Sequence, residues 1–181
     1  MLRRANIRSI VGVAVVMLAV LAGVSACVPA GRLTAGKAAL PQFDVAAFFA
    51  GRTQGRGILK IAMRRTEPVS VDGSGQTAAD GMILLDQGVR QGNRDIKRRQ
   101  WQLRAIGPGR YAGTLSDAAG PVVGEVTGNV LHLRFALKGG FKADQWLTLQ
   151  PGGNEARNVM IIRKFGMPVA RLDEVIMRVP G

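Results

Sequence analysis

The sequence predicts an all-β fold, an antiparallel up-and-down barrel of about nine or ten strands with a short helix before it. From Gly55 onward, apolar and polar residues alternate, which is the period of a half-buried strand. Turn-forming pairs such as Pro108-Gly109, Gly128-Asn129 and Gly139-Gly140 separate the alternating runs. No helical runs of about 10–15 residues alternate with them, so an α/β fold is excluded. Closing consecutive strands into a barrel removes exposed sheet edges.

Residues 43–51 (FDVAAFFAG) are expected to form the short helix. Asp44 is a suitable N-cap, and Gly51 is typical of a helix end. Val45 and the neighbouring pair Phe48-Phe49 lie on one side, and so short a helix is stable only if that side packs on a larger body. Two roles remain open for it, which are packing in the core and acting as a lid over the barrel mouth.

The strands follow in order, and residues 95–106 show the alternation most clearly. One side of this run carries Arg99, Trp101 and Leu103, and the other side is polar. An apolar interior with a polar exterior argues against an outer-membrane barrel, whose outward face is apolar. The runs interpreted as strands are residues 55–65, about 67–76 with an interruption at Asp72-Gly73, 82–90, 95–106, 110–117, 122–128, 130–138, 141–150, 155–165 and 168–179.

The beginning of the chain has the layout of an export signal. Arginines precede an apolar run over residues 10–21, and small residues then lead to Cys27, the only cysteine. The sequence Val24-Ser25-Ala26-Cys27 resembles the lipobox of bacterial lipoproteins, in which the cysteine receives a lipid. A retained transmembrane helix over residues 9–31 is the alternative, because this stretch carries no charge.

The lipoprotein interpretation divides the chain into three parts. Residues 1–26 would be a signal peptide, residues 27–41 the lipidated cysteine and a flexible tether, and residues 42–180 the barrel domain. A lipid on Cys27 that carries more than one acyl chain, such as palmitate, would anchor the protein stably to a membrane. Val28 stands where an Asp would favour the inner membrane, so the resemblance implies the outer membrane, with the domain facing the periplasm. A lipidated single cysteine leaves no disulfide.

Composition and motifs narrow the function classes. The chain has 25 Lys and Arg against 12 Asp and Glu, but only 5% aromatic residues, so nucleic acid is not an expected partner. The only histidine, His132, lies on the polar side of its run, and neither a nucleophile motif nor a His/Cys metal cluster is present. We therefore expect no catalytic residue, no metal and no cofactor, and a protein that is not an enzyme.

A set of short motifs occurs in a specific order after residue 100. Its residues are Trp101, Tyr111, Gly113, Asp117, Gly124, Glu125, Gly128, Asn129, Asp144, Trp146, Asn158, Lys164, Phe165 and Gly166. This order resembles a family of bacterial lipoproteins that is catalogued as a domain of unknown function. The resemblance covers residues 43–179 and implies a lipocalin-like barrel in the envelope, without an established activity. Gln145 and Val159 depart from the family pattern, which weakens any acid–base role there.

The candidate ligand-binding residues are three same-face pairs, which are Arg99 with Trp101, Asp144 with Trp146, and Asn158 with Lys164. If they face the interior, they form a polar cluster within or at the mouth of an apolar cavity. We then expect a barrel that binds or shuttles an amphiphile such as a fatty acid or phospholipid, with the head group held by Arg99 or Lys164. The alternative is a filled barrel in which Asp144 and Lys164 pair. The protein would then be a structural envelope lipoprotein that contacts anionic lipid or a protein partner.

Overall fold

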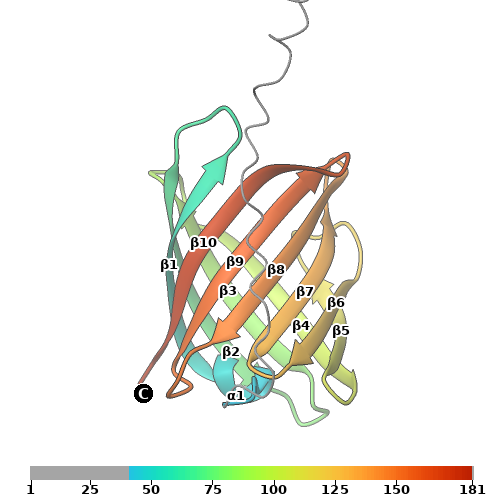
Figure 1. Ribbon diagram of the computed structural model, residues 1–181. Coiled ribbons are helices and arrows are strands. Elements are labelled where there is room, and N and C mark those ends of the chain that lie inside the picture. Colours follow the sequence, from blue (N-terminus) through green and yellow to red (C-terminus); the bar gives the residue numbers. More distant parts are fainter. Residues whose placement is uncertain (1–40, 181) are drawn as a thin grey trace, which may run out of the picture. The chain divides into compact units, whose positions relative to one another are not determined.

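The computed structural model describes residues 41–180, which form a closed barrel of ten antiparallel strands with one short helix before it (Figure 1). Each strand pairs with its neighbour in the sequence, and β1 pairs with β10 to close the barrel. The all-β barrel prediction is confirmed. The elements are α1 (Val45–Phe49), β1 (Gly51–Ile61), β2 (Glu67–Thr77), β3 (Ile83–Gln91), β4 (Lys97–Gly107), β5 (Arg110–Leu115), β6 (Val122–Thr127), β7 (Val130–Leu137), β8 (Phe141–Leu149), β9 (Glu155–Lys164) and β10 (Met167–Val179).

The predicted signal peptide, Cys27 and nearly all of the tether lie outside the described residues. Among residues 41–180, no helix has the length and apolar character needed to cross a bilayer.

Two details of the first strands differ from the sequence-based expectation. β1 begins at Gly51 and ends before Met63, which lies in the following turn. β2 runs without interruption through Asp72 and Gly73, although Asp-Gly is a common turn pair. Gly73 pairs with Thr53 on one side and with Gln87 on the other, and a Cβ on Gly73 would collide with the Thr53 hydroxyl. The glycine therefore serves close packing inside the barrel and not a turn.

Helix α1 lies at one end of the barrel (Figure 1). The Asp44 side chain accepts a hydrogen bond from the Ala47 N–H (3.0 Å), and Gly51, with φ of 80°, follows the helix, as predicted. The N–H of Phe43 donates to the Gly128 carbonyl in the β6–β7 turn (2.9 Å). We call the end of the barrel at which α1 lies the helix end. The opposite end carries the turns β1–β2, β3–β4, β5–β6, β7–β8 and β9–β10, and we call it the open end.

The core fills the barrel unevenly. The predicted face of α1 is buried and belongs to the main hydrophobic cluster, together with Trp101, Leu103 and Leu131. Of the two roles expected for the helix, it therefore has the one in the core. A smaller cluster of Val69, Val71 and Leu172 lies apart from it. Ten strands enclose a wider lumen than the eight that side chains just fill, so the helix supplies apolar bulk that the strands alone lack.

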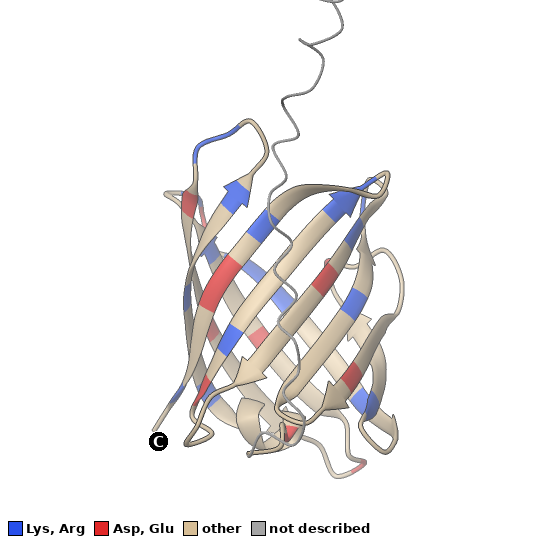
Figure 2. Cartoon of the chain, in the orientation of Figure 1, with Lys and Arg blue, Asp and Glu red and all other residues tan. Residues whose placement is uncertain are grey.

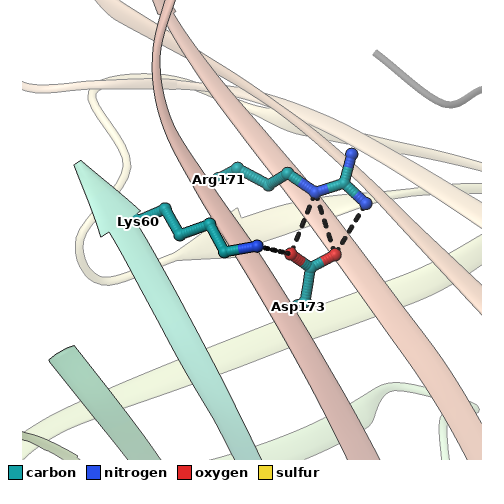
Figure 3. Close-up of polar contacts among 3 residues, drawn as sticks. All are labelled: Lys60, Arg171 and Asp173. Carbon is teal, nitrogen blue, oxygen red and sulfur yellow. Dashed lines mark hydrogen bonds and ion pairs between the residues drawn. The ribbon is translucent and has the colours of Figure 1, made fainter. Parts of the chain in front are cut away.

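Charged residues are spread along the strands and turns of the barrel (Figure 2). One cluster lies on β1 and β10, the first and last strands, which pair to close the barrel (Figure 3). Arg171 donates to both carboxylate oxygens of Asp173, with Nε 2.9 Å from Oδ1 and 3.0 Å from Oδ2. Lys60 Nζ lies 3.7 Å from Asp173 Oδ2. The hydrogen bonds from Arg171 hold the pKa of Asp173 below its usual value, and the charges of Arg171 and Lys60 add to this effect.

Replacing Phe48 by alanine should destabilise the domain strongly. Phe48 is 2% exposed in the main cluster, so removing its ring leaves a cavity and costs about 3–5 kcal/mol of unfolding free energy. Urea unfolding followed by circular dichroism measures the change. The matched control is Phe165→Ala, because Phe165 is 87% exposed, and its loss should change stability by less than about 0.5 kcal/mol. Equal effects of the two substitutions would contradict the assignment of α1 to the hydrophobic core.

Replacing Asp173 by asparagine should destabilise the domain only at neutral pH. A folded-state pKa below the unfolded one contributes stability above the unfolded pKa, and this contribution disappears as the pH falls through the folded pKa. Because the Asp173 side chain is 36% exposed, solvent screening limits the effect to about 1 kcal/mol or less. Urea unfolding at neutral and acidic pH measures the difference. A loss that persists unchanged in acid would show that the ion cluster is not its cause.

Candidate ligand-binding site

A cavity of about 390 Å³ occupies the barrel between its middle and the open end. Most of its wall is apolar and comes from nearly all the strands, so it is a feature of the closed barrel and not of one loop. A few polar side chains join the wall at its floor and mouth, which is the usual composition of a small-molecule site. The lining residues that the argument uses are Arg99, Leu115, Phe135, Met160 and Leu172, with Lys97, Asp117 and Lys138 nearer the mouth.

Arg99 forms the floor of this cavity. It points inward from β4 with Trp101, while the intervening Gln100 is exposed on the outer face. Arg99 Nε donates to Gln87 Oε1 (2.8 Å), and Trp101 Nε1 donates to the same oxygen (2.9 Å). The Cζ atom of Arg99 lies 5.8 Å from the Trp101 ring centroid. One amide thus fixes the Nε edge of the guanidinium over the indole and leaves its terminal nitrogens for other partners.

The charge of Arg99 is incompletely compensated. Within residues 41–180, Arg99 forms no ion pair. Burial lowers the pKa of Arg99, and the more distant charges of Glu174 and Asp117 oppose this effect. An arginine side chain nevertheless stays cationic in a protein. A half-buried cation with unused N–H donors at the floor of a cavity is a binding site for an anion.

Beneath Arg99 lies a small space of about 30 Å³, lined also by Trp101, Gln145 and Glu174. It is large enough for about one water molecule. Asn158 Nδ2 donates to Glu174 Oε2 (2.7 Å), while Glu174 Oε1 and Asn158 Oδ1 are buried without a hydrogen-bond partner. The Glu174 carboxyl lies against Gly55, where a Cβ would collide with it. This pair separates the cavity from the filled helix end.

Burial raises the pKa of Glu174. The hydrogen bond from Asn158 and the charges of Arg99 and Arg56 oppose the shift without cancelling it. The protonated carboxyl is therefore favoured over a wider pH range than in an exposed glutamate. A neutral carboxyl can donate a hydrogen bond, and in this form Glu174 does not repel an anion held by Arg99.

Cationic side chains lie at the mouth of the cavity. Lys97 Nζ is 3.2 Å from Asp117 Oδ2, and Lys138 is exposed. Lys164 lies at the same end, where its Nζ is 4.6 Å from the Phe141 ring centroid. It is not among the residues that line the cavity, so its role as a head-group ligand stays a prediction.

The expected cluster of Asp144, Trp146, Asn158 and Lys164 does not form, and the interior placement of Asp144 and Trp146 was wrong. On β8 the inward residues are Gln145 and its neighbours at alternate positions, so Asp144 and Trp146 face outward. Asp144 Oδ2 accepts from Arg163 (2.7 Å), and its Oδ1 lies 3.3 Å from His132 Nε2, so Asp144 does not pair with Lys164. Trp146 stacks on His132 with ring centroids 4.7 Å apart.

Arg99, Trp101 and Asn158 do lie inside, as the sequence indicated, and His132 lies on the outer face. Sequence reasoning missed Gln87 and Glu174. Both occupy inward positions of runs that are otherwise apolar, between Leu85 and Val89 and between Leu172 and Ile176, and a polar residue in such a position is the signal that identifies them. Within the described residues, no three His, Cys, Asp or Glu side chains are grouped as metal ligands would be.

Replacing Glu174 by glutamine should stabilise the domain at neutral pH. A carboxyl with a raised folded-state pKa loses its proton first in the unfolded chain, so stability falls as the pH rises from the ordinary carboxyl pKa through the raised one. Glutamine has no proton to lose, and its side-chain oxygen still accepts a hydrogen bond from Asn158. We therefore expect Glu174→Gln to raise the free energy of unfolding by about 1–3 kcal/mol at neutral pH and by little in acid. Urea unfolding across this pH range measures the effect. The control is Glu125→Gln at an exposed position of β6, and a pH-independent difference for Glu174→Gln would contradict the assignment.

Solved structures with the same barrel are distant in sequence. The S-type phycobiliprotein lyase CPES from Guillardia theta is 11% identical with a TM-score of 0.60, and the alignment covers 77% of this chain and 94% of that one. Rv2717c from M. tuberculosis is 20% identical with a TM-score of 0.59, covering 74% and 94%. A protein of unknown function from the DUF3598 family of Nostoc punctiforme is 14% identical with a TM-score of 0.59, covering 81% and 53%. At these identities the likeness establishes the fold, the expected lipocalin-like barrel.

No curated protein sequence matches this chain significantly. The family described as "Protein of unknown function (DUF3833)" matches residues 21–178, which is most of the chain. The resemblance drawn from the motifs around Trp101, Trp146 and Lys164 is therefore confirmed at the level of the family and its fold. The chain belongs to the DUF3833 family.

Proposed function

We propose that the protein is a lipid-anchored envelope lipoprotein whose barrel binds a single-chain anionic amphiphile such as a fatty acid. The observation that carries the proposal is Arg99, a half-buried cation that forms no ion pair within residues 41–180 and lies at the floor of an apolar cavity. The acyl chain would lie along the apolar wall and the acidic head group on the terminal nitrogens of Arg99. A volume of about 390 Å³ is near the lower limit of ligand pockets, which are roughly 300–1,000 Å³, and favours one chain over a two-chain phospholipid.

Binding is supported over catalysis by the state of the carboxyl groups near the cavity. Asp117 is paired with Lys97, and Glu174 holds Asn158, so the groups left to meet a ligand are cationic or amide side chains. One structural neighbour is named a phycobiliprotein lyase, which by its name acts on phycobiliproteins. That shared barrel supports a ligand-handling role for this chain and supplies no reaction. We therefore propose that this protein is not an enzyme.

The lipid anchor and the outer-membrane location are part of the proposal. They rest on the lipobox-like sequence that ends at Cys27 and on Val28 after it. The anchor would hold the barrel at a membrane surface, where an amphiphile is concentrated. A carrier without an anchor would have to find the same molecules by diffusion.

A second candidate is a structural lipoprotein that holds no small ligand. It is favoured by the packing of the helix end, where α1 and Trp101 leave only about 30 Å³ empty. In that case the larger cavity would be filled by water, and the exterior would carry the function through anionic lipid or a protein partner.

Native mass spectrometry of the protein as released from the envelope in mild detergent tests the two candidates. We expect a non-covalent added mass that matches a fatty acid or a related acidic amphiphile. Arg99→Gln should reduce its retention at least about tenfold, because a charge-assisted hydrogen bond contributes about 1.5–3 kcal/mol. Arg98→Gln is the matched control, since Arg98 is the next residue of β4 and is exposed on the outer face.

A bare polypeptide that takes up no fatty acid when offered it would favour the structural lipoprotein. Equal losses from Arg99→Gln and Arg98→Gln would place the head group elsewhere. A lipid bound covalently at Cys27 is distinguished from the ligand because it survives denaturation.

A further inference from the structure

The open end of the barrel displays large apolar side chains on the tips of two turns. Met63, in the β1–β2 turn, is fully exposed, and Phe165, in the β9–β10 turn, is 87% exposed. Met167 follows Phe165 closely and is 63% exposed. Both turns project at the end opposite α1 (Figure 1). Exposed apolar residues are common when scattered, but these share one end of the barrel, the open end.

The backbone at both tips is unusual. Met63 has φ of 60° and Phe165 has φ of 51°, and they are the only residues other than glycine with positive φ in the part of the chain that the structure describes. A side chain disfavours this left-handed conformation, which glycine or asparagine adopts at lower cost. Bulky side chains that persist in such positions are typical of functional sites. Each turn thus presents an apolar side chain to the surroundings against its backbone preference.

Cations surround the two tips. Arg64 and Arg65 follow Met63, and Lys164 precedes Phe165, with its Nζ 5.6 Å from that ring centroid. Figure 2 shows basic residues along the β1–β2 turn and at the end of β9. Lys138 and Lys142 add charge on and beside the β7–β8 turn.

The acidic residues at this end leave most of that charge uncompensated. Glu67 and Asp117 are engaged with Arg94 and Lys97, and Asp95 is the exposed acid of the β3–β4 turn. Within residues 41–180, no ion pair involves the basic residues closest to the tips or the β7–β8 turn, which are Arg64, Arg65, Lys138 and Lys142. At the helix end, Arg104 is paired with Asp80, and Asp44 caps α1.

We propose that the open end is a docking surface for an anionic phospholipid bilayer. Met63 and Phe165 would enter the interfacial layer, and the surrounding Arg and Lys would contact lipid phosphates, as basic and apolar residues do together in peripheral membrane proteins. The inference rests on the proposed function in one respect: docked in this way, the cavity mouth faces the bilayer that supplies the amphiphile.

The proposed anchor allows this orientation. An extended chain spans at most about 3.3–3.6 Å per residue, so residues 27–41 reach about 50 Å. β1 has 11 residues and is about 36 Å long before any tilt. A lipid on Cys27 therefore permits either barrel end to meet the membrane, although residue 43 is bonded at the helix end. The apolar tips and the charge distribution would then decide which end docks.

Lipid-borne quenching of site-specific labels tests the orientation. The full chain carrying Met63→Cys or Phe165→Cys is labelled with an environment-sensitive fluorophore and reconstituted into vesicles that contain spin-labelled lipid. Vesicles of equimolar phosphatidylcholine and phosphatidylglycerol are compared with vesicles of phosphatidylcholine alone. Ile106→Cys is the matched control, because Ile106 is a 52% exposed apolar residue near the helix end. The wild-type chain, labelled in parallel, reports any reaction of Cys27.

We expect strong quenching at residues 63 and 165 on the anionic vesicles, weak quenching on phosphatidylcholine, and none at residue 106. High salt should reverse the quenching at residues 63 and 165, because salt screens the attraction between exposed charges. Arg64→Gln with Arg65→Gln should lower the docking equilibrium about twenty-five-fold, since each basic residue near an anionic surface contributes about fivefold.

Labels at residues 63 and 165 that stay in water on anionic vesicles, or equal quenching at residue 106, would overturn the proposal. Protection of these labels in native envelopes but not on vesicles would also overturn it, and would identify a protein as the occupant. The outcomes are independent of the proposed function. A chain that carries an amphiphile but does not dock refutes only this inference, and a chain that docks but carries nothing refutes only the proposed function.

Discussion

Closure of ten strands is the constraint on which the rest of this structure depends. Because side chains alternate, every second residue of each strand enters the lumen and must either pack or find polar partners there. The lumen is wider than these side chains can fill, and the sequence fills only one half of it, with the apolar face of α1 and the cluster around Trp101. The other half remains a cavity whose walls are held by the strand pairing itself.

The boundary between the two halves is polar, and this is what gives the cavity a chemical preference. Gln87 uses one carbonyl oxygen to hold both Arg99 and Trp101, so the guanidinium is fixed without being neutralised. Glu174 lies on the far side of a space of about 30 Å³ and is bonded to Asn158 instead of Arg99. A direct buried ion pair would have satisfied both charges and removed the reason to bind an anion. Their separation leaves Arg99 available.

The sequence predicted the fold well because its strand signals are local. Alternation and turn pairs are properties of short segments, and they located α1 and the ten strands to within a few residues. The candidate site was harder to predict, because tertiary packing decides which side chains of a strand point into the barrel. On β8 the usual signal is inverted, since polar Gln145 points inward and aromatic Trp146 points outward, where His132 covers its ring. Nothing in the sequence indicates that Gly55 makes room for the Glu174 side chain, or Gly73 for the Thr53 side chain. These contacts become visible only when the paired strands are placed side by side.

The interior and the open end favour the same direction of entry. An amphiphile in a bilayer has its head group at the surface, so a cavity mouth that rests on the bilayer meets the head group first. Lys97 and Lys138 at the mouth attract an acidic head but remain hydrated, which weakens their hold on it. Arg99 lies deeper, where desolvation makes the same interaction stronger, so an anion gains by moving past the mouth to the floor. The acyl chain then follows along the apolar wall. Head-first entry therefore requires no reversal inside the lumen, and it makes the basic mouth and Arg99 successive parts of one path.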